Sequence, residues 1–368
     1  MASMIGRGET ITTRGRLAPE LPLPPHVDAA HAADWNYSPD QQALFAAATQ
    51  WRRAHDIPRA SASDPNVHLL VVDAQKDFCF PRGTLYVGGR SGRGAVEDNE
   101  RLAAFIYRNL GTITRLTTTM DTHLAYQIFF APFWLDRDGA PLQPHTVITT
   151  DDIRSGHARP DPDLAWWLCD GDNDWLRRQV EYYCAELARG GRYELYLWPP
   201  HCILGSDGHA LAGVIHEARM FHSFVRGVQS WSEIKGTNPL TENYSVLRPE
   251  VLTTFDGRLL AYKNEAFIAT LLSADMVVVA GEASSHCVRS SVEDLLEEIV
   301  ARDPALARKV YLLGDCMSAV TVPDGKGGFV ADFTEQAMAA ERRFVAAGMR
   351  VVRSTDPIAS WPGIAISH

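Results

Sequence analysis

The sequence predicts an α/β fold: a doubly wound, mostly parallel sheet with helices on both faces. Short apolar runs rich in β-branched residues recur from Val67 onward, and each ends in polar residues or glycine. Longer amphipathic stretches separate these runs. Strands that alternate with helices in this way are typical of a parallel sheet covered on both sides.

Six segments have the composition of buried strands: 67–73, 112–121, 228–235, 275–281, 309–315 and 349–354. Five have the spacing of helices: 95–110, 209–225, 264–274, 287–301 and 334–348. In the segment 287–301 the apolar side chains are expected on one face; they are Val288, Val292, Leu295, Leu296, Ile299 and Val300. Sites in such folds form at the carboxyl ends of strands, so catalytic residues are expected just after the strands.

The chain divides into an N-terminal extension, residues 1–66, and one α/β domain, residues 67–368. The extension has a proline-rich stretch and one helix-like segment at 39–56, which favours an arm that packs on the domain or on a partner subunit. Residues 136–192 interrupt the alternation of strands and helices and are predicted to be an insertion within the domain. The insertion is turn-rich at first, then acidic, aromatic and helical.

Charge and cysteine content narrow the class of protein. The 368 residues carry a formal net charge of −10, from 35 basic and 45 acidic residues, which argues against a nucleic-acid partner. No apolar run reaches the roughly 18 residues of a membrane span, and the N-terminus lacks the apolar segment of a secretory signal. The six cysteines form no CxxC pair, which favours free thiols and a cytoplasmic enzyme.

Cys287 has the position of a nucleophile. It follows a predicted strand and a glycine-containing turn, and it begins an amphipathic helix. Backbone N–H groups and the helix dipole would stabilise a thiolate there, and the same N–H groups could receive an oxyanion. A small buried hydrophobe is an equally good interpretation from position alone. The other five cysteines lack this context and are expected to be structural.

Two charged residues also follow predicted strands. Asp73 closes the strand 67–73, where a carboxylate would be a partly desolvated base; a helix-cap or turn role fits equally, and Asp77 and Asp64 compete with it. Lys235 ends the strand 228–235, where its charge would favour a neighbouring thiolate. A lone lysine is more often a solvated surface residue.

Three further residues could bind a metal ion. Asp121 and His123 form a D-x-H pair at the end of a strand, and His201 follows the strand-like YELYLWPP. One carboxylate and two imidazoles suit Zn²⁺ or Fe²⁺, and fewer than four protein ligands leave positions open for water or substrate. A D-x-H pair alone is a weak signal among thirteen histidines.

Five sequence blocks resemble the isochorismatase-like cysteine hydrolases, within them the nicotinamidase branch. The blocks are VVDAQKDF, TMDTH, LWPPHCILGSDG, KGTNPLTENYS and VVVAGEASSHCVRSSVEDLL. They occur in the family's order and cover about residues 67–135 and 193–354. The resemblance implies the family's α/β hydrolase fold and an enzyme acting on C–N amide bonds.

The resemblance also implies roles for individual residues. Asp73, Lys235 and Cys287 would be the catalytic triad, and Asp121, His123 and His201 the ligands of a divalent metal ion, zinc first, with iron or manganese as alternatives. The Glu282–Ala283 bond matches the family's non-proline cis peptide, which would aim the N–H of Ala283, beside that of Cys287, into an oxyanion hole. Phe78 would line the substrate pocket.

The implied reaction converts a small amide to a carboxylic acid and ammonia through a thioester on Cys287. Nicotinamide is the best single substrate, and a homo-oligomer is expected. The chain departs from the family where DTHLAYQIFFAPFW replaces a DWHP-like segment and where the nucleophile turn reads GEASSHC. Another small amide, ureide or cyclic imide therefore stays open as substrate. Isochorismatase activity and a non-catalytic role are the remaining alternatives.

Overall fold

The centre of the molecule is a six-stranded parallel sheet. The computed structural model describes residues 17–191 and 193–364. The strand order is β12 (Arg350–Val352), β9 (Val310–Leu313), β8 (Met276–Gly281), β1 (Val67–Val72), β2 (Ile113–Asp121) and β7 (Trp231–Lys235). All five neighbouring pairs are parallel. The predicted doubly wound α/β fold is confirmed, and each predicted strand is one of these six.

Strand register aligns the carboxyl ends of four neighbouring strands, β8, β1, β2 and β7. Every residue of β1 and of β8 is buried, as continuous apolar runs in a parallel sheet require. Val72 pairs with Gly281 across β1 and β8, and Asp121 pairs with Lys235 across β2 and β7. The residues that follow these strands therefore leave the sheet at the same edge.

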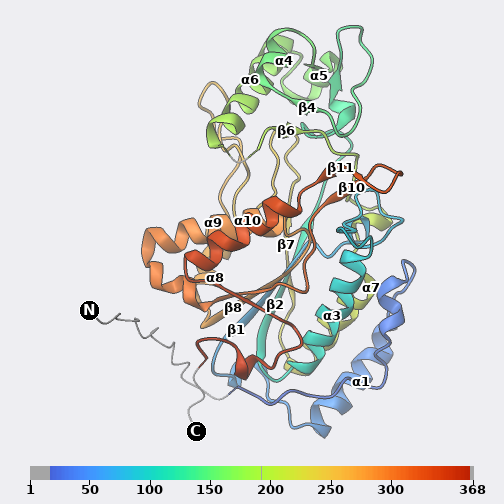
Figure 1. Ribbon diagram of the computed structural model, residues 1–368, viewed down its shortest axis with the longest axis vertical. Coiled ribbons are helices and arrows are strands. Elements are labelled where there is room, and N and C mark those ends of the chain that lie inside the picture. The colour runs from blue at the N-terminus through green and yellow to red at the C-terminus, as the bar shows by residue number, and fades with distance from the viewer. Residues whose placement is uncertain (1–16, 192, 365–368) are drawn as a thin grey trace.

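Helices cover both faces of the sheet (Figure 1). The chain moves from β1 through α3 (Gly94–Arg108) to β2, and through α7 (Gly213–Arg226) to β7. It then returns through α8 (Glu265–Ser273) to β8, and continues through α9 (Cys287–Arg302) and α10 (Thr334–Ala346). Right-handed crossovers in opposite directions place these two groups of helices on opposite faces. The short helix α2 (Lys76–Cys79) follows β1, and a hairpin of β10 (Thr321–Pro323) and β11 (Phe329–Asp332) precedes α10.

The predicted apolar face of α9 is narrower than expected. Four of its apolar residues are buried at helical spacing: Val288, Val292, Leu295 and Ile299. Leu296 is only partly buried, and the side chain of Val300 is 56% exposed. Ile299 in the same last turn is fully buried, so only the side of α9 that carries Leu296 and Val300 lies toward solvent.

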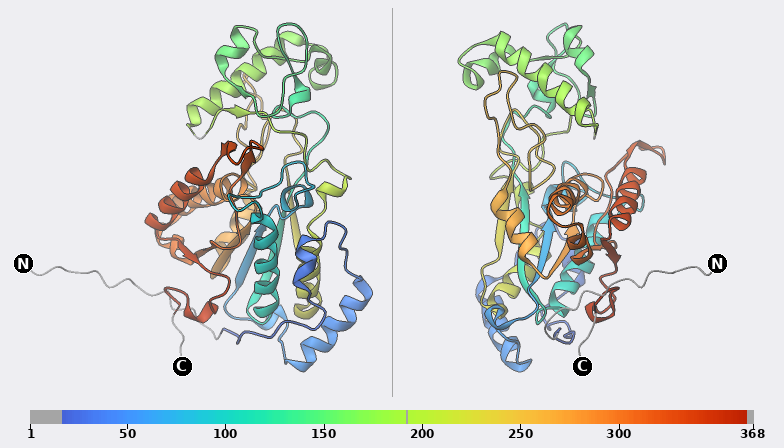
Figure 2. Two further views of the ribbon diagram at one scale, coloured as in Figure 1. Left: turned by 45° about the vertical axis from the view of Figure 1, so that its right-hand side comes forward. Right: turned by 90° about the vertical axis from the view of Figure 1, so that its left-hand side faces the viewer.

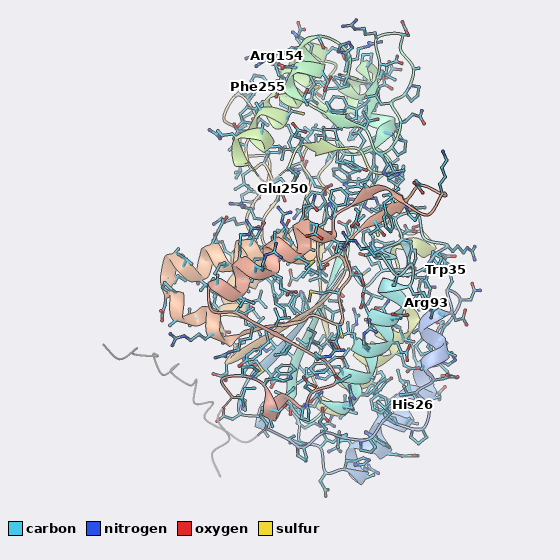
Figure 3. The ribbon with its side chains drawn as sticks, viewed as in Figure 1. His26, Trp35, Arg93, Arg154, Glu250 and Phe255 are labelled. Atoms are coloured by element: carbon cyan, nitrogen blue, oxygen red, sulfur yellow. The ribbon has the colours of Figure 1, made fainter. Side chains whose placement is uncertain are left out.

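The N-terminal arm packs along the helices of one face. It contains η1 (Ala29–Ala33), α1 (Gln41–Ala54) and η2 (Ala60–Ala62), and α1 packs against α7. The carboxylate of Glu217 on α7 accepts hydrogen bonds from Tyr37 of the arm and from Tyr107 of α3, the latter at 2.7 Å. His26 lies beside this cluster, and Trp35 lies further along the arm (Figure 3).

An upper lobe stands over the carboxyl ends of the strands (Figure 2). It contains the short strands β3 (Trp134–Leu135), β4 (Val147–Ile148), β5 (Arg159–Pro160) and β6 (Leu195–Tyr196), with α4 (Thr150–Arg154), α5 (Ala165–Leu168) and α6 (Asn173–Gly190). β3 pairs with β5 and β4 with β6. Phe255, from the loop after β7, lies in this lobe beside α6 (Figure 3).

The strand expected before His201 is only two residues long. β6 pairs with β4 in the upper lobe and lies outside the central sheet. His201 therefore reaches the sheet edge from the segment that returns from the lobe. No helix in the described part of the chain is long and apolar enough to cross a membrane.

Candidate active site

The ends of four neighbouring strands bring the predicted site residues together. Asp73 follows β1, Asp121 ends β2, Lys235 ends β7, and the turn after β8 leads to Cys287. The chain reverses its direction of progress between β1 and β8, which is the switch point where sheets of this type build sites. The shared edge of the sheet thus places two carboxylates, one amine and one thiol in a single buried cluster.

Lys235 is the centre of the cluster. Its Nζ lies 2.9 Å from a carboxylate oxygen of Asp73 and donates a hydrogen bond of 2.8 Å to Asp121. The same Nζ lies 3.6 Å from Sγ of Cys287. Burial opposes the charge, but the two carboxylates outweigh it and hold the pKa of Lys235 well above its ordinary value. Lys235 is therefore a buried ammonium ion, not the solvated lysine of the alternative interpretation.

Asp73 is a fully buried carboxylate beside the thiol. Burial raises its pKa, against the opposing effects of Lys235 and of the hydroxyl of Thr119, which donates a hydrogen bond to it. Its backbone N–H donates to the same hydroxyl at 2.9 Å. Asp73 is neither a helix cap nor a loose turn residue, and its raised pKa makes it a stronger base.

The surroundings of Cys287 favour a protonated thiol. Burial raises its pKa well above the ordinary value, and the neighbouring carboxylates of Asp73 and Asp121 add to this beyond what Lys235 offsets. Burial and the two carboxylates therefore oppose the thiolate that the helix terminus is expected to stabilise. Lys235 contacts both the thiol and Asp73, so a carboxylate that can accept the thiol proton lies close by.

The competing residues lie elsewhere or have other partners. Asp77 accepts hydrogen bonds from the backbone N–H groups of Cys202, at 2.7 Å, and Thr84, at 3.2 Å, and so ties two loops together. Asp64 precedes β1 and lies at the opposite end of the sheet. Asp73 is thus the acid that the fold places beside Cys287.

Asp121, His123 and His201 form a group that fits a metal ion. One ligand atom from each lies within 4.8 Å of the other two. Nδ1 of His123 is bonded to the carbonyl of Gly236 at 3.0 Å, and Nδ1 of His201 to the carbonyl of Pro199 at 2.8 Å. Both Nε2 atoms then face one carboxylate oxygen of Asp121, at 2.8 and 3.5 Å. Carbonyls that orient the ligating histidines are typical of metal sites.

Residues that the sequence interpretation missed support this group. The side-chain amide of Gln75 accepts from the backbone N–H of Asp121 at 2.7 Å and donates to its carbonyl at 2.8 Å. This pair of bonds extends the pairing of β1 and β2 past the strand ends. Gly236 has φ of 86°, and a Cβ there would lie 2.6 Å from Cε1 of His123. A polar residue soon after a strand end was the available signal for Gln75.

The thiol of Cys287 faces a small pocket lined mostly by apolar side chains. Phe78, as predicted, lies on its wall, with its ring centroid 5.4 Å from that of His201. The buried carboxyl of Glu242 also faces the pocket; burial raises its pKa to about 8. Glu242 comes from the irregular loop after β7, where no sequence signal marks it. The open volume is about 30 Å³, room for about two water molecules.

The turn that carries the nucleophile has the predicted backbone form. The Glu282–Ala283 peptide bond is cis. Among the described residues, no backbone carbonyl accepts a hydrogen bond from the N–H of Ala283 or of Cys287. Cys287 is the first residue of α9, so its N–H has no partner within the helix. These two donors are the ones assigned to the oxyanion hole.

Comparisons with known proteins return similar solved structures. No family model and no curated protein matches the chain. The yeast nicotinamidase Pnc1p bound to the inhibitor nicotinaldehyde is 19% identical, with 78% of this chain and 99% of that one covered and a TM-score of 0.48. The pyrazinamidase of Pyrococcus horikoshii in complex with zinc is 18% identical, with coverages of 78% and 99% and a TM-score of 0.41.

An isochorismatase-like hydrolase from Alkaliphilus metalliredigens is 12% identical, with coverages of 78% and 95% and a TM-score of 0.37. At these levels of similarity the comparison concerns the fold alone. Solved structures similar to this chain thus include nicotinamidases, a pyrazinamidase and an isochorismatase-like hydrolase.

Proposed function

We propose that this protein is a cysteine amidohydrolase that cleaves a small amide to a carboxylic acid and ammonia. The observation that carries the proposal is the contact of one buried ammonium group, Lys235, with both Asp73 and Cys287. A protonated thiol, a raised-pKa carboxylate and a fixed cation are the parts that nucleophilic catalysis by cysteine requires.

The first half of the reaction forms a thioester. Asp73 accepts the thiol proton as Sγ of Cys287 attacks the amide carbonyl, and Lys235 stabilises the negative charge that develops on sulfur. The carbonyl oxygen becomes an oxyanion, which the N–H groups of Ala283 and Cys287 stabilise. Asp73 then returns the proton to the nitrogen, so that ammonia leaves when the C–N bond breaks.

The second half releases the acid. Asp73 takes a proton from a water molecule that attacks the thioester carbonyl, and the same N–H groups stabilise the second oxyanion. The C–S bond breaks, the carboxylic acid forms, and Cys287 regains its proton. Burial raises the pKa of the thiol and so favours the thiol over the thiolate. Asp73 is therefore needed to accept the thiol proton before the attack and to give a proton back afterwards.

Asp121, His123 and His201 would hold a divalent ion, with zinc the first choice for one carboxylate and two imidazoles. When bound, such an ion supplies a Lewis-acid contact that can position a substrate with a ring nitrogen. Nicotinamide is accordingly the first substrate to test. Phe78, next to His201, would contact the substrate ring.

The proposal is tested by ammonia release from nicotinamide and a panel of other small amides. Cys287→Ala should lose activity by a factor of about 10⁴ or more, as removal of a covalent nucleophile does. The matched control is Cys184→Ala, which removes a buried thiol from α6 in the upper lobe and should leave the rate unchanged. Full activity in Cys287→Ala would refute the mechanism. Metal analysis of the double variant Asp121→Ala, His123→Ala tests the ion separately.

A further inference from the structure

A second cavity adjoins the catalytic pocket on the side of the upper lobe. The two share three wall residues, Trp198, Tyr244 and His286. The open volume of the outer chamber is about 230 Å³, against about 30 Å³ in the catalytic pocket. An acyl group too large for the catalytic pocket would therefore extend from Cys287 toward this chamber.

The walls of the outer chamber are aromatic and come from separate parts of the chain. Tyr196 of β6 lies against Trp198, with ring centroids 4.4 Å apart, and Phe333 at the start of α10 lies 4.7 Å from His286. Trp198 donates a hydrogen bond of 2.7 Å to the hydroxyl of Tyr244. The upper lobe, the loop after β7, the nucleophile turn and the C-terminal helix thus converge on one aromatic chamber.

The shared wall carries no charge at neutral pH. Burial lowers the pKa of His286 to about 3, with a further contribution from Arg289, and Nδ1 of its ring is bonded to Ser285 at 2.8 Å. Of the charged residues on the lining, Glu194 is exposed and Arg289 is paired with Glu293 at 3.2 Å. Flat rings of neutral character offer stacking and edge contacts to a planar ligand.

From these contacts we propose that the outer chamber is a binding subsite for an aromatic ring of the substrate. The substrate is then a primary carboxamide whose acyl group has at least two fused or linked rings. This inference rests on the proposed amidohydrolase function, because it places the amide of the same molecule at Cys287. Pockets of this kind bind mainly through apolar lining with few polar groups, which matches the chamber.

The test compares a one-ring amide, nicotinamide, with a two-ring amide, quinoline-3-carboxamide. The value of kcat/KM from ammonia release should be at least about tenfold higher for the two-ring amide, as one or two aromatic contacts provide. Gln336→Trp, which fills the chamber from α10, should remove this preference and leave nicotinamide within twofold of wild type. Arg342→Trp, on the same helix and outside the chamber lining, is the control and should keep the preference.

Binding to Cys287→Ala separates the two proposals. Calorimetry should show tighter binding of the two-ring amide than of nicotinamide, and Phe333→Leu should reduce that difference. If neither amide releases ammonia with wild type but the difference in binding is present, the subsite stands and the proposed function fails. Equal binding and equal kcat/KM for the two amides, with ammonia released from both, would overturn the subsite and leave the function intact.

Discussion

Replacing Lys235 by methionine tests whether the buried ammonium group holds the site together. Methionine keeps a long unbranched side chain but removes the charge. Lys235 lies 2.9 Å from Asp73 and 2.8 Å from Asp121, and at an effective dielectric of about 20 each attraction is about 6 kcal/mol. Much of this offsets the desolvation of the lysine, and removal of one partner of a buried ion pair typically costs about 3–5 kcal/mol.

Lys235→Met should therefore lower the free energy of unfolding by about 3–5 kcal/mol, measured by urea denaturation of metal-free protein at pH 7. The turnover number should fall by a factor of at least about 10², because the charge on sulfur loses its nearby cation. The loss of stability arises from two carboxylates left buried without a counter-charge.

The matched control is Lys309→Met. Lys309 is also buried, but its Nζ donates to the backbone carbonyls of Leu272 and, at 2.8 Å, Ala274. These groups lie at the amino-terminal ends of β8 and β9, opposite the edge of the sheet that carries the site. This change should cost about 1–3 kcal/mol and leave turnover unchanged. If Lys235→Met unfolds within 1 kcal/mol of wild type, the buried-charge account of the cluster is wrong.

Three further outcomes follow from local geometry. Gly236→Ala should reduce the metal content measured by mass spectrometry, because its Cβ would displace the ring of His123. The control is Gly257→Ala, which has φ of 81° and open space around its Cβ. It carries the same backbone strain of about 1–3 kcal/mol and should keep the metal. Burial raises the pKa of Glu282 well above its ordinary 4.5, so the stability this residue contributes is complete below pH 4.5 and is lost as the pH rises toward the folded-state pKa. The melting temperature of Glu282→Gln should accordingly exceed that of wild type by a margin that widens from pH 5 to pH 9, and a margin that narrows contradicts this. Glu217→Leu leaves two tyrosine hydroxyls without their acceptor, which should cost about 2–3 kcal/mol and expose the N-terminal arm to limited proteolysis faster than in wild type.

Sequence patterns were sufficient for the sheet and for the residues at its edge. Asp73 and Lys235 could be found because β-branched runs mark the strands and parallel strands end together. Glu242 could not, because it comes from an irregular loop with no periodic pattern. The protonation of Cys287 was also out of reach, since it depends on how deeply neighbours far apart in the chain bury the thiol.

The outer chamber shows the same limit. Two of its rings, Tyr196 and Phe333, are separated by more than a hundred positions, and no spacing rule connects them. His286 stands where the nucleophile turn departs from the resembled family, but only the fold shows that this residue forms the wall between two cavities. The positions of strand ends can be read from the sequence and indicate where reactive residues gather. The shape of the substrate site depends instead on packing between residues far apart in the chain.

The three proposed metal ligands come from two parts of the protein, so a bound ion would cross-link those parts. Asp121 and His123 are held at the end of β2, while His201 belongs to the segment that returns from the upper lobe. Binding of an ion would therefore stabilise the attached position of the lobe. The stabilisation is about 2.7 kcal/mol when the free ion is at one hundred times its Kd. Chelation should speed hydrogen exchange in the lobe before it affects the sheet, so the supply of metal ions would govern how firmly the roof of the site is closed.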